Sequence, residues 1–139
     1  MTAAVTGVLD TNTVVLISRL DAADLPDEAF ITTVTLAELS IGPLVAADAT
    51  ERANRQARLQ HAEASYEALP FDAAAARAFG AVAASLRGSG RKVMARSFDA
   101  LIAATAMANG LALYTCNPRD FEGIDGLDLV AVGHPDVVP

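Results

Sequence analysis

The segment VTGVLDTNTVVL (residues 5–16) decides the fold of this chain, because it changes from a strand pattern to a helix pattern at one acidic residue. The run from Val5 to Leu9 is short and mostly apolar, which predicts a buried strand. Asp10 follows at once, and residues 11–20 have the apolar spacing of a helix. A strand that leads directly into a helix is typical of a parallel α/β sheet. The Asp10 carboxylate is therefore expected at the carboxyl end of the first strand.

Three further acidic residues occupy comparable places. Glu38, in TVTLAELSIG, falls in the first turn of the helix expected after the second strand. Asp99, in SFDALIAA, falls in the first turn of its own helix, and Asp120, in TCNPRDF, follows the third strand. Ligands of open α/β sheets bind outside the carboxyl ends of the strands. We therefore expect the four acids to converge on one edge of the sheet.

The rest of the chain alternates between strand and helix patterns. Strands are expected at residues 30–33, 111–115 and 128–132, with a turn or short strand at 69–71. Helices are expected from Thr35 to at least Ile41, over 50–68, from an Asp72 cap to about 87, and from a Ser97 cap to near 110. This alternation predicts the α/β class with right-handed crossovers. We expect one domain over residues 1–139, with a loosely ordered tail at about 133–139.

Length and charge limit the classes of function. The chain has 139 residues, 53% of them hydrophobic, which suits one domain with one substantial core. A net charge of −7 argues against a uniformly basic nucleic-acid binder. The basic residues nevertheless gather in two stretches, which are Arg52, Arg55 and Arg58, and Arg87, Arg91, Lys92 and Arg96. Each stretch either contacts phosphates or forms the solvated face of a helix.

Cysteine usage and the N-terminal segment predict where the protein works. The single cysteine, Cys116, excludes an internal disulfide framework. The first basic residue is Arg19, so the N-terminal region does not resemble a signal peptide. We therefore expect a cytoplasmic protein with no membrane contact.

Each acidic residue also has a purely structural interpretation. Thr35 to Glu38 fits a capping box, and Asp99 complements a helix dipole. Asp10 fits an Asx turn or a helix cap, and Asp120 fits a surface turn. Taken together, however, clustered carboxylates repel one another unless they ionise only partially or share a cation. Oxygen ligands favour Mg²⁺ or Mn²⁺, which indicates metal-assisted phosphodiester chemistry.

With these motifs identified, the chain resembles a known family. LDTN around Asp10, LAELSIG around Glu38, FDALIAATA around Asp99 and YTCNPRDFEGI around Asp120 are similar to the four motifs of PIN domains. The small size further resembles the VapC-type toxins of type II toxin–antitoxin pairs. The resemblance implies a PIN-like three-layer fold, with a central parallel sheet of four to five strands flanked by helices. It also implies a Mg²⁺-dependent endoribonuclease (Mn²⁺ as a substitute) that acts on RNA, forms a homodimer and is inhibited by a cognate VapB-type antitoxin.

The family's functional residues transfer to named positions. Asp10, Glu38 and Asp99 match the three core acids and are expected to be catalytic and to hold the metal. Asn117 departs from the pattern, because many relatives have Asp there, so Asp120 is expected to supply the remaining catalytic and metal-binding charge. Polar positions beside the site are expected to orient carboxylates or water, and these are Thr11, Thr115 and Asn117.

RNA contacts and rival functions complete the expectations. The RNA backbone is expected to be steered toward the acids by Arg87, Arg91, Lys92 and Arg96. One rival is a haloacid-dehalogenase-like phosphohydrolase, since Asp10 to Thr13 loosely resembles its nucleophile loop. The other is a non-catalytic PIN-like binding module, whose acidic site would bind an arginine-bearing partner tail.

Overall fold

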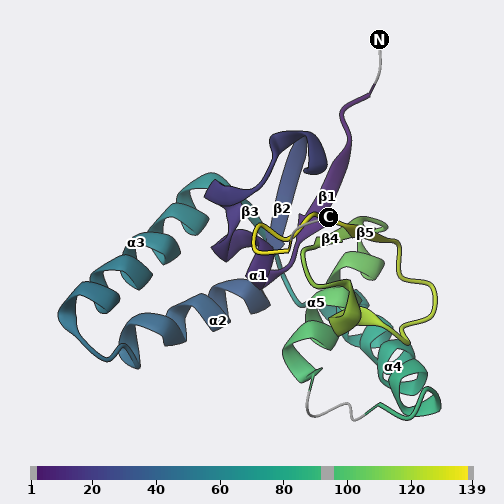
Figure 1. Ribbon diagram of the computed structural model, residues 1–139. Coiled ribbons are helices and arrows are strands. Elements are labelled where there is room, and N and C mark those ends of the chain that lie inside the picture. The colour runs from purple at the N-terminus through teal and green to yellow at the C-terminus, as the bar shows by residue number, and fades with distance from the viewer. Residues whose placement is uncertain (1–2, 92–95, 138–139) are drawn as a thin grey trace.

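Five parallel strands form one central sheet in the computed structural model, which describes residues 3–91 and 96–137 (Figure 1). The strands are β1 (Thr6–Leu9), β2 (Glu28–Thr32), β3 (Glu67–Leu69), β4 (Ala112–Thr115) and β5 (Leu129–Ala131), in the order β3-β2-β1-β4-β5. Every neighbouring pair is parallel, with Val8 opposite Phe30 on one side and Leu113 on the other. The predicted α/β class and parallel sheet are confirmed.

The strand order creates a switch point beside β1. The chain builds outward from β1 through β2 to β3, then returns to place β4 on the other side of β1. Connections therefore leave β1 and β4 in opposite directions. In open α/β sheets the carboxyl ends of two such strands border a crevice in which ligands bind. Asp10 follows β1 directly at this crevice, and β4 ends there at Thr115.

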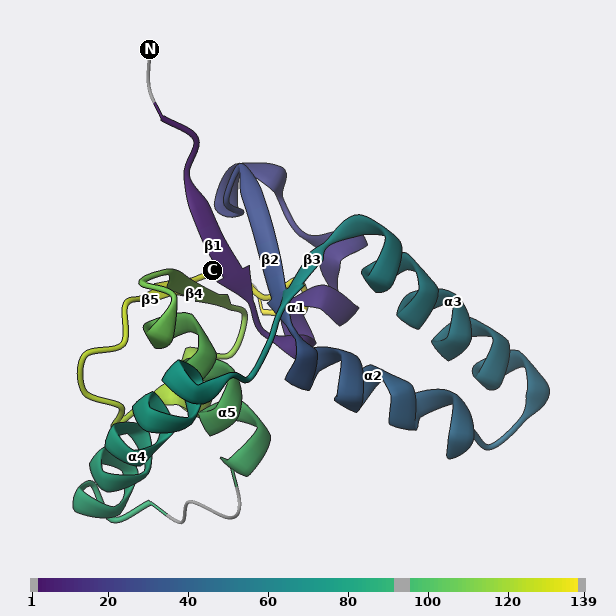
Figure 2. The same cartoon turned by 180° about the vertical axis from the view of Figure 1, so that it is seen from behind.

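The helices form two groups around the sheet. They are α1 (Thr11–Val15), α2 (Thr33–Leu44), α3 (Ala49–Ser65), α4 (Ala73–Gly88) and α5 (Ser97–Ala108), with short 3-10 turns at Ile17–Arg19, Ala22–Asp24 and Pro118–Phe121. Both views show α2 and α3 as an antiparallel arm that projects away from the sheet (Figures 1 and 2). Helices α4 and α5 pack against each other on the other side (Figure 2).

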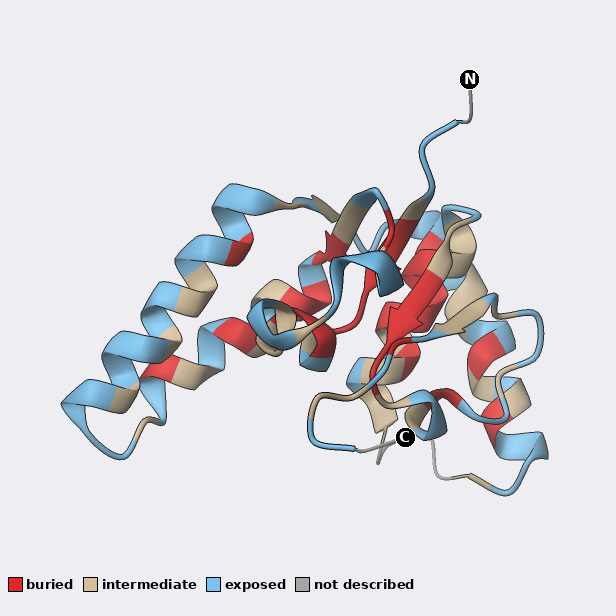
Figure 3. Ribbon diagram, turned by 45° about the horizontal axis from the view of Figure 1, so that its top comes forward, coloured by how far each residue is buried: buried red, intermediate tan, exposed pale blue. Residues whose placement is uncertain are grey.

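The core has two layers because neighbouring strand residues point to opposite faces. Leu9 and Ile31 pack with residues of α1, α2 and α3, whereas Val8 and Leu113 pack with the alanine-rich side of α5. Figure 3 shows buried positions concentrated along the strands and the inner turns of the helices. Burial on both faces is typical of parallel sheets, and it anchors the strand ends on which the site depends.

Gly7 allows β1 and β4 to pack closely. A Cβ atom at this position would lie 2.4 Å from Cε1 of Tyr114, which is closer than real contacts allow. The Tyr114 ring therefore occupies the space that a side chain at position 7 would need. A larger residue there would displace the ring or separate the two strands that carry Asp10 and Thr115.

Two expected helices end earlier than the sequence pattern indicates. The helix expected over 11–20 is wrong beyond α1, because its β-branched run is a poor helix former and continues as 3-10 turns. The helix expected over 50–68 ends at Ser65. Residues 67–69 instead pair with β2 as an edge strand, so tertiary pairing overrides the local helical pattern.

The helix caps divide into confirmed and incorrect predictions. Asp72 caps α4 as predicted, accepting from the Ala75 N–H at 2.9 Å. Ser97 is wrong as a cap, because it is the first helical residue of α5. Helix α2 starts at Thr33 rather than Thr35, and the Thr32 hydroxyl caps it by accepting from the Thr35 N–H at 3.2 Å.

The C-terminal residues contact the body of the protein at two points. The Val132 N–H donates to the Thr115 carbonyl at 2.8 Å, and Asp136 forms an ion pair with Arg19. A single domain over 1–139 with a loose tail stays a prediction. No helix within the described ranges is both long and apolar enough to cross a membrane.

Candidate active site

Asp10 is the most deeply buried of the four predicted acids, with 2% of its surface exposed. It ends β1 and caps α1, and its Oδ1 accepts from the Thr13 N–H at 3.0 Å. The Thr13 hydroxyl also donates to Oδ1, and the Thr115 hydroxyl donates to Oδ2 at 2.7 Å. Both carboxylate oxygens are thus fixed by neutral donors. The capping interpretation of Asp10 is correct, and the same contacts orient the carboxylate at the crevice.

Each threonine that holds Asp10 is itself held by the chain after β4. The Cys116 N–H donates to the Thr13 hydroxyl oxygen at 3.1 Å, and the Asn117 N–H donates to the Thr115 hydroxyl oxygen at 2.9 Å. Because each hydroxyl accepts from the backbone, its proton is directed toward Asp10. Two parallel relays therefore couple the ends of β1 and β4. Asn117 contributes to them through its main chain.

Glu38 is held by a different hydroxyl group, which in turn contacts a second one. The Thr11 hydroxyl donates to Glu38 Oε1 at 2.6 Å, and it lies 3.0 Å from the Thr35 hydroxyl. The capping-box interpretation of Glu38 is wrong, because α2 starts two residues before Thr35 and Glu38 points to α1 instead. Helix α2 therefore presents Glu38 to the first turn after Asp10.

Asp99 and Asp120 lie on the other side of the crevice, on α5 and the following 3-10 turn. Asp99 is in the first turn of α5 and half-buried. Asp120 accepts from Arg96 at 2.8 Å, in a pair whose side chains are each about one-third exposed. Arg96 immediately precedes α5, so this ion pair joins the start of that helix to the turn after β4.

The carboxylates influence one another electrostatically. Burial, together with the charges of Asp120, Asp10 and Glu38, raises the pKa of Asp99 to about 7, while Arg96 partly opposes the rise. Burial likewise raises the pKa of Asp10 and of Glu38, against the lowering effect of their threonine hydrogen bonds. The charges of Asp120, Asp10 and Glu38 therefore all act on Asp99. Without a cation these charges favour protonation of Asp99 near neutral pH.

The donor set fits a hard divalent cation in its chemistry. The predicted site residues carry carboxylate and hydroxyl oxygens, and Mg²⁺ and Mn²⁺ prefer such ligands. Within residues 3–91 and 96–137, no three His, Cys, Asp or Glu side chains already form a group that could hold a metal ion. The other three carboxylates raise the pKa of Asp99, but the acids in the described ranges are not arranged as a preformed metal site.

Two threonines that sequence reasoning missed complete the site. Thr13 donates to Asp10 through both its amide and its hydroxyl, and Thr35 extends the Thr11 contact to α2. The available signal was spacing, because the third residue after a helix cap is where a backbone donor faces the capping carboxylate. Both residues are fully buried, which explains why polar side chains persist there.

The geometry does not favour the rival reactions, in which an aspartate or a cysteine would act as the nucleophile. Both oxygens of Asp10 accept hydrogen bonds in a buried position, which does not suit an in-line nucleophile of the dehalogenase type. The Cys116 thiol is buried, and burial raises its pKa, which disfavours the reactive thiolate. His61 contacts Ser65 on α3, and His134 contacts Asp136 near the C-terminus.

The predicted RNA-contacting residues are placed differently from one another. Arg87 is exposed in the last turn of α4, while Arg91 pairs with Glu122 at 2.7 Å. Arg96 is engaged with Asp120, and Lys92 lies outside the described residues. Two of the four thus hold internal ion pairs next to the site.

The family description "PIN domain" matches residues 7–127, a span that contains all four acids and both predicted threonines. The chain belongs to the PIN-domain family. This PIN domain is 40% identical to Ribonuclease VapC5 of Mycobacterium tuberculosis over 129 residues, covering 91% of this chain and 93% of that protein. It is 37% identical to the tRNA(fMet)-specific endonuclease VapC of Shigella flexneri over 98 residues, covering 70% of each.

Solved structures agree with the sequence relatives. The VapBC-5 toxin–antitoxin structure of Mycobacterium tuberculosis matches this PIN domain with a TM-score of 0.80 and 41% identity, covering 91% of this chain and 98% of that one. The DNA-bound VapBC structure of Salmonella typhimurium matches with a TM-score of 0.71 and 27% identity, covering 90% and 96%. The resemblance to VapC-type PIN domains, and the PIN-like fold class, are confirmed.

Proposed function

We propose that this PIN domain is the endoribonuclease toxin of a VapBC-type pair, and that it hydrolyses RNA phosphodiester bonds with a divalent cation held by its four acids. The observation that carries the proposal is the fixing of Asp10 and Glu38 by threonine hydroxyls at the switch point of the sheet, in a chain that matches the PIN domain over residues 7–127. The names of the relatives, Ribonuclease VapC5 and tRNA(fMet)-specific endonuclease VapC, support the activity and the substrate class.

Asp10, Glu38, Asp99 and Asp120 are the residues that would hold Mg²⁺ or Mn²⁺. When bound, the ion supplies positive charge that activates water and offsets charge developing on the phosphate. Thr13 and Thr115 keep both Asp10 oxygens in place, and Thr11 does the same for Glu38. These hydroxyls remain neutral, so they orient the acids without cancelling the charge that a cation needs.

The basic residues before α5 extend the proposal to the RNA. We assign Arg87, Arg91, Lys92 and Arg96 to steering the RNA backbone toward the acids. Arg96 has a second task, because its ion pair with Asp120 holds that carboxylate at the site. Reversal of charge at exposed Arg87 is expected to weaken RNA binding and flatten its dependence on salt.

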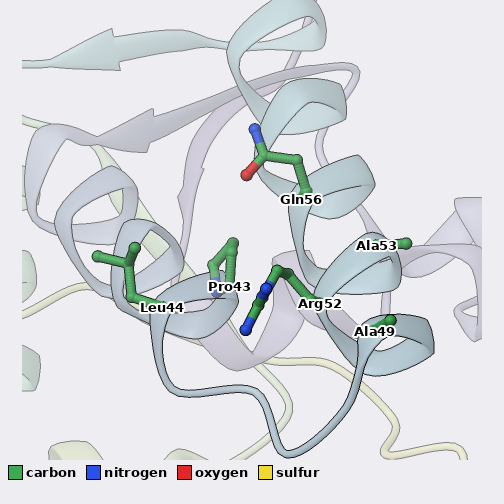
Figure 4. A pocket seen from close by; sticks show the side chains of 6 residues that line it. All are labelled: Pro43, Leu44, Ala49, Arg52, Ala53 and Gln56. Atoms are coloured by element: carbon green, nitrogen blue, oxygen red, sulfur yellow. The ribbon is translucent and has the colours of Figure 1, made fainter.

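A VapB-type antitoxin is the proposed protein partner, and the arm formed by α2 and α3 offers it a surface. Leu44 and Val45 are 83% and 65% exposed at the end of α2, and Ile41 is 46% exposed one turn earlier. A groove of about 520 Å³ lies between the two helices at this point (Figure 4). Exposed apolar clusters of this kind mark protein interfaces. The Leu44→Asp variant should lose antitoxin binding and still cleave RNA.

The remaining parts of the proposal are the homodimer and the cytoplasmic location. Sedimentation of the purified chain tests the first. Localisation of the tagged protein in cell fractions tests the second. Neither outcome alters the assignment of the acidic site.

The first experiment is cleavage of total cellular RNA by the purified chain with Mg²⁺ or Mn²⁺. Discrete fragments that vanish with EDTA and in Asp99→Asn establish a metal-dependent ribonuclease, and end-mapping identifies its target. Asp128→Asn, an exposed acid next to β5, is the matched control and should cleave normally. Metal binding without cleavage would favour the non-catalytic binding module, an alternative that the neutral Asn117 keeps open.

A further inference from the structure

A second cleft lies between α1, α2 and α3. It has a volume of about 270 Å³, and its lining includes Thr11 and Glu38 of the site together with Glu51, Arg55 and Arg58 of α3. The cleft therefore connects the carboxylate edge of the sheet with a basic stretch that lies elsewhere in the sequence. The family's acidic motifs do not include either arginine.

The two arginines lie on the same face of α3 but differ in their contacts. Arg55 donates to Glu51 at 2.8 Å and to the Gly42 carbonyl of α2 at 2.9 Å. Gly42 permits this approach, because a Cβ atom there would lie 3.2 Å from Arg55 Cδ. Arg55 therefore ties α2 to α3. Since residues three apart share a helix face, Arg58 is turned toward the same cleft.

Arg58 is the basic side chain of the cleft whose charge is not used inside the protein. It is half-buried, and no carboxylate in residues 3–91 and 96–137 lies within ion-pair distance of it. A half-buried guanidinium without a carboxylate partner is well suited to bind an anion that enters the cleft.

We propose that Arg58 binds a backbone phosphate of the RNA substrate next to the scissile bond, in the cleft that leads from Glu38 along α3. The inference rests on the proposed ribonuclease function and adds the path of the strand to it. RNA is favoured over a protein carboxylate because the cleft opens onto Thr11 and Glu38, where the reacting phosphate is expected, and adjacent phosphates of one strand follow it. The planar guanidinium matches phosphate in two-point geometry.

The test measures binding of a fluorescent single-stranded oligoribonucleotide and of total tRNA by anisotropy, in the non-cleaving Asp99→Asn protein, at several salt concentrations. Arg58→Gln should weaken binding by about 5- to 20-fold and lower the salt slope by about 0.7, the value for one lost contact to a single strand. Arg58→Lys should restore most of the slope. Arg77→Gln, at an exposed site on α4, is the control for loss of one charge and should change neither quantity.

Cleavage kinetics and antitoxin binding separate the outcomes. With Asp99 intact, Arg58→Gln should raise KM more than it lowers kcat, because it removes ground-state binding. If the parent cleaves and binds RNA but Arg58→Gln equals it, the phosphate subsite is wrong and the ribonuclease assignment stands. If Arg58→Gln weakens only antitoxin binding, the arginine belongs to the protein interface. If the parent neither binds nor cleaves RNA, both proposals fail.

Discussion

The two halves of the acidic edge are built on different principles. Asp10 and Glu38, on the β1 and α2 side, are fixed by threonine hydroxyls and enter no ion pair among the described residues. Asp99 and Asp120 are on the α5 side, where Asp120 is paired with Arg96 and the charges of Asp120, Asp10 and Glu38 act on Asp99. Neutral donors hold a carboxylate in place and preserve its charge, whereas an arginine holds it and cancels the charge. If the proposed cation binds, we therefore expect the first half to hold it more strongly.

The largest expected difference is in RNA cleavage, between variants that lose an acid from one half of the edge and variants that lose one from the other half. Asp10→Asn should lower RNA cleavage by about 1,000-fold, because it removes an uncompensated charge at the centre of the site. Asp120→Asn should lower it by about 10-fold, since its charge is already balanced by Arg96. Initial cleavage rates at saturating Mg²⁺ measure both, and melting temperatures check that each variant is folded. Equal losses would show that the ion pair does not distinguish the two acids.

The threonine hydroxyls allow a sharper comparison within the first half. Thr115 is fully buried and donates to Asp10, while Thr11 is half-buried and donates to Glu38. Thr115→Val should cost about 1–3 kcal/mol of unfolding free energy, because it leaves a buried acceptor unsatisfied. Thr11→Val should cost less than about 1 kcal/mol.

Both valine variants should cleave RNA about 10- to 100-fold more slowly, as expected when the group that orients a metal ligand is lost. Urea unfolding and initial rates separate the two effects. A Thr11→Val protein with full activity would mean that Glu38 needs no support from α1.

The field at Asp99 predicts a dependence of stability on pH. Its pKa is raised from 3.8 to about 7, so the folded state binds the proton more tightly than the unfolded state. The resulting stabilisation is fully present below about pH 4 and is lost as the pH rises through about 7. After discounting for partial solvent exposure, the loss amounts to about 1–2 kcal/mol.

Thermal unfolding in EDTA between about pH 5 and 8.5 measures this loss. Asp99→Asn should flatten the curve, and saturating Mg²⁺ should stabilise the parent most at the high-pH end, where all the acids are ionised. Asp128→Asn, which lies outside the field, is the control for a general change in net charge. A parent whose stability rises over this range would contradict the assignment of the raised pKa.

The sequence predicted the acids better than it predicted what surrounds them. Asp10 directly follows an apolar strand, so its place at the sheet edge is fixed by local pattern and parallel topology together. The ion pair of Arg96 with Asp120 depends on how α5 packs beside the turn after β4, which no local pattern encodes. The same holds for Glu38, whose partner on α1 lies 27 residues away in sequence. Local pattern placed a turn or short strand at 69–71, whereas β3 covers Glu67–Leu69, where β2 offers it a pairing edge.

The smallest expected effect comes from adding an acid where the chain has Asn117. The backbone N–H of Asn117 already donates to the Thr115 hydroxyl, and its backbone carbonyl accepts from the Asp120 N–H at 3.0 Å. The main chain of Asn117 is therefore part of the site. Asn117→Asp keeps those backbone contacts and adds one negative charge to the α5 side. The Mg²⁺ concentration for half-maximal cleavage should fall by about 3- to 10-fold, because a further carboxylate strengthens binding of a hard cation.

The same substitution should lower stability in EDTA, since the added charge increases the repulsion that already raises the pKa of Asp99. Asn54→Asp, at an exposed position on α3, adds the same charge away from the site and should change neither quantity. A half-maximal Mg²⁺ concentration that does not move would mean that the cation is held by the Asp10 and Glu38 half alone. The Arg96–Asp120 ion pair would then join α5 to the turn after β4 without taking part in metal binding.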